Sequence, residues 1–329
     1  MKGNGKTHPM EKEQNEKNES CNTCLSMLPE GCIAEIFAFT SPPVVCRFSL
    51  VSTSLRSAAD SDSVWAKFLP SDYPSIIAKS PTPIPDFPSL KDAYVYLADH
   101  PLLIDEGRKT FSLDKWTGKK CYFLGARDLN IVSSDTPDAW EWTSVPESRF
   151  PEVAQLKFIR WLQIWGTIRA GILSLLTSYT AYFVYKLGDD SYGFDTRHME
   201  VSVGISGVES ANVRIAFLHL NPKFIPEDMY TSPYTPPSPY IEYCWMGPLW
   251  PGIDYDPPED VDWDHHPSNL KLDKPVPKLR DDGWFELELG NFFTENEDDC
   301  IELRMEDVKT GCTKQGLIVE GIEIRPTIA

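Results

Sequence analysis

The chain has 329 residues and a formal net charge of −18, from 49 acidic and 31 basic side chains. This negative charge opposes binding to a phosphate backbone or an anionic membrane surface, so neither nucleic acid nor membrane is an expected partner. With 41% hydrophobic residues the chain can build sizeable cores, and no apolar stretch approaches the roughly 20 residues that span a bilayer.

Residues 1–24 are polar and charged and lack the apolar core of a secretory signal. This composition predicts a disordered tail and a protein of the cytoplasm, the nucleus or both. The eight cysteines are too sparse for a disulfide framework, and we interpret them as free thiols. Cys21 and Cys24 stand at metal-ligand spacing, but no second close pair of Cys or His completes a zinc site.

Residues 25–69 carry the apolar periodicity of short helices. Pro29 suits the first turn of a helix, and Ile33, Ile36 and Phe37 then recur at the spacing i, i+3, i+4. Three short helices bury little apolar surface by themselves, so an apolar face left exposed on them would need a partner protein. The alternative interpretation is that this stripe packs against the rest of the same chain.

A second helix is expected from Ser41, which can act as its cap, with Pro42 at the first helical position. Ser52 can interrupt or recap it, and Asp62 or Ser63 can begin a last short helix. The apolar side chains at helical spacing in this stretch are Val44, Phe48, Val51 and Leu55, followed by Trp65 in the last helix.

Residues 70–104 form a proline-rich connector with a short helix expected at 90–98. Its prolines predict a link that holds the two flanking parts at a semi-fixed distance.

From residue 105 to 329 the apolar period changes to two, which predicts half-buried β-strands at 178–188, 198–205, 284–290 and 300–306. Many such strands with little helix between them favour an antiparallel sandwich. The expected fold class is therefore mainly β with a small α part.

The region 221–280 interrupts the alternation and holds nearly half of the chain's 28 prolines, so it is interpreted as a long, partly ordered insertion. Its stretch 254–266 places acidic side chains beside His265 and His266, where a divalent cation could bind. A solvated acidic loop is the favoured interpretation, and neither metal nor other cofactor is expected. Local signatures of common enzyme classes are missing, so no catalytic residue is predicted.

The segment 28–70 resembles the F-box motif over about 40 residues. The resemblance is carried by Leu28-Pro29-Glu30, the stripe from Ile33 to Phe37, Ser41-Pro42, Val51-Ser52, Leu55-Arg56 and Trp65. It implies docking onto the Skp-family adaptor of a cullin-RING ubiquitin ligase. The adaptor-binding residues that it implies are Leu28, Pro29, Ile33, Ile36, Val51, Leu55 and Trp65. Two departures are Gly31, which weakens a helix by at most about 1 kcal/mol, and Ser52, where many F-boxes carry Cys.

The region from residue 105 to 326 resembles the phloem-lectin, or Nictaba-like, domain. The matching stretches include the segments 111–131, 135–156, 178–187, 282–293 and 316–326. The resemblance implies a jelly-roll-like sandwich that binds glycans containing N-acetylglucosamine.

A sugar pocket needs an aromatic plane for the C–H face of the ring and polar groups for its hydroxyls. The resemblance implies Trp140, Trp142 and Asp307 as carbohydrate-binding residues, and an extended segment would place both indoles on one face. Ser133 stands where the family carries a tryptophan, and Cys300 where it carries an acidic residue. The ligand could therefore be another glycan or a protein epitope, and core packing is the alternative role of the two tryptophans.

Together these patterns predict a non-catalytic substrate-recognition subunit of an SCF-type ubiquitin ligase. Its F-box would bind the adaptor and, through it, the cullin, and its sandwich would bind a protein or glycoprotein target. The first alternative is a cytosolic or nuclear lectin that acts as a stress or defence sensor without ubiquitin transfer. The second is a hydrolase that uses the acidic insertion.

Overall fold

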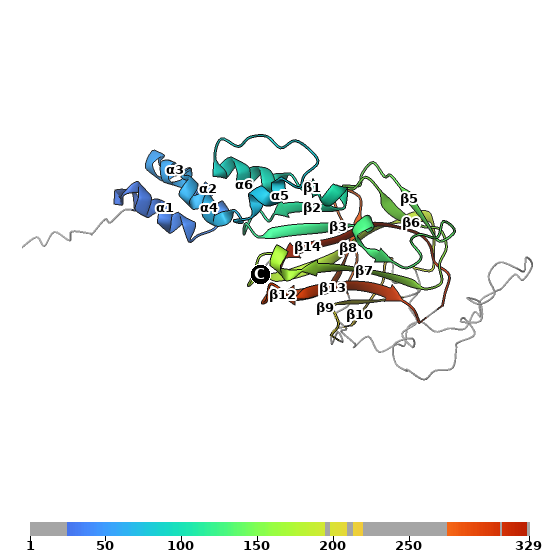
Figure 1. Ribbon diagram of the computed structural model, residues 1–329. Coiled ribbons are helices and arrows are strands. Elements are labelled where there is room, and N and C mark those ends of the chain that lie inside the picture. The colour runs from blue at the N-terminus through green and yellow to red at the C-terminus, as the bar shows by residue number, and fades with distance from the viewer. Residues whose placement is uncertain (1–24, 195–197, 209–212, 220–274, 310, 328–329) are drawn as a thin grey trace, which may run out of the picture.

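The computed structural model describes residues 25–194, 198–208, 213–219, 275–309 and 311–327, which form a group of helices beside a β-sandwich (Figure 1). The expected tail at 1–24 and most of the expected insertion, including 254–266, lie outside the described residues. The helices are α1 (Glu30–Ala38), α2 (Pro42–Phe48), α3 (Thr53–Ala59), α4 (Asp62–Phe68), α5 (Tyr73–Ile77) and α6 (Leu90–Asp99).

The second helix expected from Ser41 is interrupted and recapped at Ser52, as the sequence allowed, and so forms two helices. Helix α2 ends at Phe48, and α3 begins after Ser52, whose hydroxyl accepts a hydrogen bond of 3.2 Å from the backbone N–H of Leu55. Because the chain turns between them, one continuous apolar stripe does not form. Val45, and not Val44, is the fully buried valine of α2, and Val51 is exposed in the turn.

The expected connector helix is confirmed as α6, and it packs between α4 and strand β2 (Lys109–Leu113). Tyr94 of α6 lies with its ring centroid 5.2 Å from that of Trp65, and its hydroxyl donates a 3.2 Å hydrogen bond to the carbonyl of Asp114. A buried Lys120 also pairs with Asp72 at 2.8 Å. The helices and the sandwich therefore share one core.

Two antiparallel sheets form the sandwich, which confirms the expected fold class. Within the described residues the larger sheet runs β1-β2-β3-β14-β8-β12-β11, with β5 and β6 attached beside β14, and the smaller runs β10-β9-β13-β7-β4. Their bounds are β1 Leu102–Ile104, β3 Lys120–Gly125, β4 Asn130–Ile131, β5 Trp140–Thr143, β6 Val153–Leu156, β7 Leu162–Arg169, β8 Ser178–Tyr192, β9 Met199–Ile205, β10 Arg214–Ala216, β11 Lys278–Leu279, β12 Phe285–Phe293, β13 Cys300–Asp307 and β14 Gln315–Pro326.

The four strands expected from period-two alternation are confirmed as β8, β9, β12 and β13. Their alternate apolar side chains, such as Phe183, Leu287 and Leu303, are fully buried in the main core. Strand β8 departs from simple alternation because Val184 is also buried. A second, smaller cluster that includes Trp284 covers this opposite face of the larger sheet.

Beside this second cluster the larger sheet carries a network of charges centred on Glu323. Its carboxylate lies 2.6 Å from Arg280, 3.2 Å from Arg149 and 3.6 Å from Arg325. Burial alone would raise the pKa of Glu323, but the three arginines outweigh burial and hold the pKa below its usual value. The ionised form of Glu323 therefore stabilises the fold.

Glu323→Gln is expected to lower the free energy of unfolding at neutral pH by about 3 kcal/mol, because the partly buried Arg280 and Arg325 lose the buried carboxylate that compensates their charge. The folded pKa of Glu323 is depressed, so its contribution is complete above the unfolded value of about 4.3 and disappears as pH falls through the folded value. Urea unfolding over a pH series should show the gap between wild type and variant closing in acid. A gap that stays constant down to about pH 2 would contradict this assignment.

Candidate functional site

The helices α1 to α3 lie at one end of the molecule (Figure 1). They and the residues that flank them present a set of large apolar side chains to solvent. Leu28, just before α1, is 43% exposed, and Ile36, within α1, is 42% exposed. Phe48 of α2 stacks on the buried Phe37 of α1 with ring centroids 5.4 Å apart, which places the two helices side by side. We define the docking face as Met27, Leu28, Ile36, Phe39, Phe48, Leu50 and Val51.

The seven predicted adaptor-binding residues divide into an exposed and a buried group. Leu28, Pro29, Ile36 and Val51 are exposed, and the exposed fraction of Val51 is 68%. The buried members are Ile33, Leu55 and Trp65.

The buried group forms the support of the docking face. Ile33 is 1% exposed, and the indole N–H of Trp65 donates a 2.7 Å hydrogen bond to the carbonyl of Ala59. Such side chains hold α1, α3 and α4 together and offer no surface to a partner in this conformation. Phe39 and Leu50 are exposed and were missed by the sequence interpretation. Phe39 could have been found, because it continues the stripe three residues beyond Ile36.

The described part of the sandwich does not cover the docking face. Contact between helices and strands runs through α5 and α6, which meet β1 and β2, and through the end of α4. At that end, the backbone of Phe68 lies against Gly118, in the turn that follows β2. A Cβ atom at Gly118 would be 2.8 Å from the carbonyl oxygen of Phe68. The apolar stripe of α1 is therefore split, with Ile33 sealed inside the helices and Ile36 left open.

Trp140 and Trp142 lie on one side of β5, as their spacing predicted, and both donate hydrogen bonds to the loop that precedes β5. The indole N–H of Trp140 donates to the carbonyl of Val132 at 3.0 Å, and that of Trp142 to Ser134 at 3.1 Å. Trp140 is buried, which is the alternative role considered for it. Trp142 is half-buried, and the guanidinium of Arg127 lies 3.6 Å from its ring centre. A sugar ring would have to share or displace this cation.

Asp307 lies at the end of β13 and is buried. Its carboxylate is 2.5 Å from the ammonium group of Lys314, which is fully buried, and Lys314 also donates to the carbonyl of Cys312. Cys300 begins the same strand, so the two lie about 23 Å apart at the rise of a β-strand. Ser133 is exposed in the loop that receives the two indoles.

The remaining sequence predictions concern metal binding and membrane insertion. Among the described residues no group of three or more His, Cys, Asp or Glu side chains is placed to hold a metal ion. The same residues contain no helix of the length and apolarity needed to cross a membrane. Cys21, Cys24 and the acidic stretch 254–266 lie outside the described residues.

Comparison with known families gives matches over both parts of the chain. The model of the F-box domain matches residues 25–67, and the model of the phloem protein 2 family matches residues 119–326.

Relatives from Arabidopsis thaliana extend the similarity to nearly the whole chain. The F-box protein PP2-B1 is 36% identical over 312 residues, which cover 91% of this chain and 89% of that protein. The putative F-box protein PP2-B12 is 36% identical over 300 residues, 91% of this chain and 96% of its own length. The F-box protein VBF is 37% identical over 303 residues, 92% and 99% of the two chains.

Proposed function

This chain belongs to the F-box proteins that carry a phloem protein 2 domain, and from this premise we propose that it is a substrate receptor of an SCF-type cullin-RING ubiquitin ligase. In this proposal the docking face binds a Skp-family adaptor, which connects the chain to the cullin. The observation that carries it is the exposure of Leu28, Ile36 and Val51 over a support that is itself buried. Large apolar side chains gathered on a small helical unit are the usual anchors of a protein interface.

The link between docking face and sandwich supports the same role. Helix α6 fills the space between α4 and β2, and the buried Lys120 pairs with Asp72, so the adaptor and the target would be held in a fixed relation. Ubiquitin transfer by a partner enzyme then gains rate from proximity and orientation, and the chain needs no catalytic group of its own.

We assign target binding to the sandwich, with a glycan of the N-acetylglucosamine type or a protein epitope as the target. Trp142 offers an aromatic ring near the surface of β5, but Arg127 already lies over it. Asp307 is held inside by Lys314. These placements favour a contact surface that differs from the one implied by Trp140, Trp142 and Asp307. We further propose that the protein acts in the cytoplasm, the nucleus or both, which a fluorescent fusion would check.

Co-expression of the full chain with a Skp-family adaptor tests the proposal. We expect the two to co-purify as a stable complex that also recruits a cullin–RING pair and supports ubiquitin transfer within the assembly. Failure to recover adaptor with a folded full chain would contradict the receptor role. Glycan binding by that same adaptor-free chain would instead support a lectin that acts without ubiquitin transfer.

A further inference from the structure

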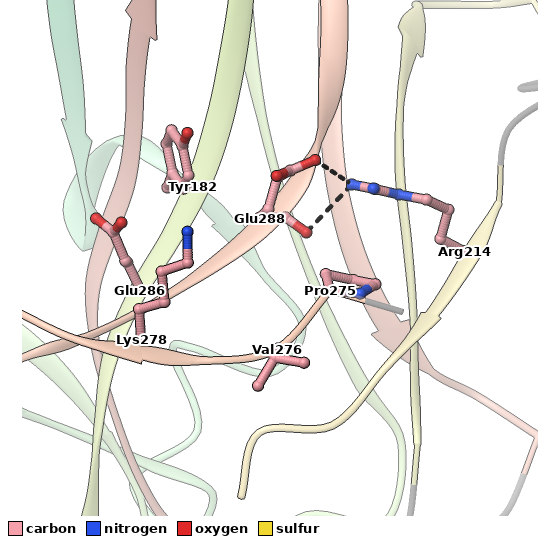
Figure 2. A pocket seen from close by; sticks show the side chains of 7 residues that line it. All are labelled: Tyr182, Arg214, Pro275, Val276, Lys278, Glu286 and Glu288. Atoms are coloured by element: carbon pink, nitrogen blue, oxygen red, sulfur yellow. Dashed lines mark hydrogen bonds and ion pairs between the residues drawn. The ribbon is translucent and has the colours of Figure 1, made fainter. Parts of the chain in front are cut away.

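A hollow of about 200 Å³ opens where the two sheets approach each other, on the side where β11 borders β12 (Figure 2). Its lining includes none of the positions implied by the lectin resemblance. Arg214 is nevertheless only one strand away from β13, because it lies opposite Val201 of β9, which lies opposite Met305. It is lined by Tyr182 of β8, Arg214 of β10, Lys278 of β11, Glu286 and Glu288 of β12, and by Pro275 and Val276 just before β11.

Both carboxylates in the hollow are fixed by arginines. Arg214 reaches from the smaller sheet and donates to the carboxylate of Glu288 at 3.1 Å and to its backbone carbonyl at 3.4 Å. Arg325 donates to both carboxylate oxygens of Glu286, at 3.1 and 3.0 Å. Glu286 and Glu288 therefore present acceptors in set positions on a rigid strand, which favours selective binding of a ligand.

Two further polar groups have no partner within the described residues. The ammonium group of Lys278 and the hydroxyl of Tyr182 make neither a hydrogen bond nor an ion pair there. Figure 2 shows Lys278 directed toward the ring of Tyr182 on one side of the hollow, with the Glu288–Arg214 pair on the other. The ring of Tyr182 is held in place by the guanidinium of Arg325, 4.0 Å from its centre. The lining of the hollow thus includes two donors without a partner among the described residues.

The lining is balanced in charge, with two cationic and two anionic side chains. A ligand of either charge would disturb this balance, and an anionic one would also face a chain of net charge −18. A neutral ligand rich in hydroxyl groups suits it, because each hydroxyl can donate to a carboxylate and accept from an ammonium or guanidinium group. Pro275 and Val276 supply apolar wall for C–H groups.

From this chemistry we propose that the hollow binds a single neutral sugar residue. Its volume is below the roughly 300–1,000 Å³ of pockets for drug-sized ligands, which fits one ring and not a long oligosaccharide. This inference rests on the proposed function, because the bound sugar would belong to the glycosylated target that the receptor holds.

Ligand-observed NMR and titration of the full chain with the methyl glycosides of N-acetylglucosamine, glucose, galactose and mannose test the proposal, with glutamate and arginine as charged probes. At least one glycoside should bind, more tightly than either amino acid. Tyr182→Phe, which removes a single hydroxyl, should weaken that binding about fivefold, and Lys278→Met by a similar factor. The matched control Lys115→Met removes an exposed lysine of the turn between β2 and β3 and should bind as wild type does.

Three results would overturn the sugar site: no glycoside binds, the Tyr182 and Lys278 variants bind as wild type, or an amino acid binds more tightly. Loss of binding in Trp142→Ala alone would place the sugar at β5 and would also refute it. Adaptor co-purification measured on the same preparations separates the two proposals. Intact adaptor binding without sugar binding rejects only the sugar site, whereas sugar binding without adaptor binding rejects only the receptor role.

Discussion

Replacement of Leu28 and Ile36 together by alanine is expected to weaken adaptor binding about 30-fold. Both side chains are a little over 40% exposed in the isolated chain, so each has apolar surface left to bury against a partner. Full burial of such a side chain contributes about 1.5–3 kcal/mol, and less than half of that remains for each at the interface. Truncation of both should therefore remove about 2 kcal/mol, which corresponds to the expected factor. Titration calorimetry of the purified chain with the adaptor would measure it.

A matched control comes from α6, where Val95 is 43% exposed but lies outside the docking face. Val95→Ala should leave adaptor affinity unchanged. Ile33→Ala, by contrast, should lower the free energy of unfolding by about 2–5 kcal/mol, because it opens a cavity in the support. Wild-type affinity in the Leu28/Ile36 double variant, with its melting temperature intact, would show that the adaptor binds elsewhere or not at all.

The largest effect on stability is expected from Lys314→Met, which should cost about 3–5 kcal/mol. Lys314 and Asp307 are both buried and only 2.5 Å apart, so removal of the ammonium group leaves a carboxylate without its counter-charge in a low dielectric. Urea unfolding followed by tryptophan fluorescence would measure the loss.

The double variant Lys314→Met/Asp307→Leu is the informative control, because removing both charges should restore most of the stability lost in the single variant.

The variant Asp307→Asn distinguishes a structural role of Asp307 from a role in sugar binding. If Asp307 serves the fold, the variant loses stability; if it contacts a sugar, the variant loses glycan binding at unchanged stability. We expect the first outcome, since Lys314 already occupies the carboxylate.

Local patterns in the sequence located helices of the N-terminal part and four strands of the sandwich. Alternation of period two located β8, β9, β12 and β13, because a half-buried strand must place every second side chain in the core. Serine and proline at helix starts located α1 and α2. Ser52, which was expected to interrupt or recap the second helix, is the cap of α3. The turn over residues 49–51 was not expected, because helical spacing continues across it in the sequence.

The docking face shows what such patterns cannot predict. Periodicity identified Ile33 and Ile36 as members of one apolar stripe, but it gives no sign of which side of the stripe another helix of the same chain will cover. Packing of α1 against α3 and α4 buries Ile33 and leaves Ile36 open.

By itself, the sequence determined the family, the N-terminal helices, the connector helix α6, four of the strands and the existence of a mainly β core, because these depend on side-chain spacing within short stretches. The tertiary structure alone decided how charges pair and which side chains reach solvent. Arg214 meets Glu288, 74 residues further along the chain, and Asp307 is enclosed with Lys314 only once β7 and the loop after β13 are in place. Such contacts arise from the closing of two sheets on each other, and no local spacing encodes them.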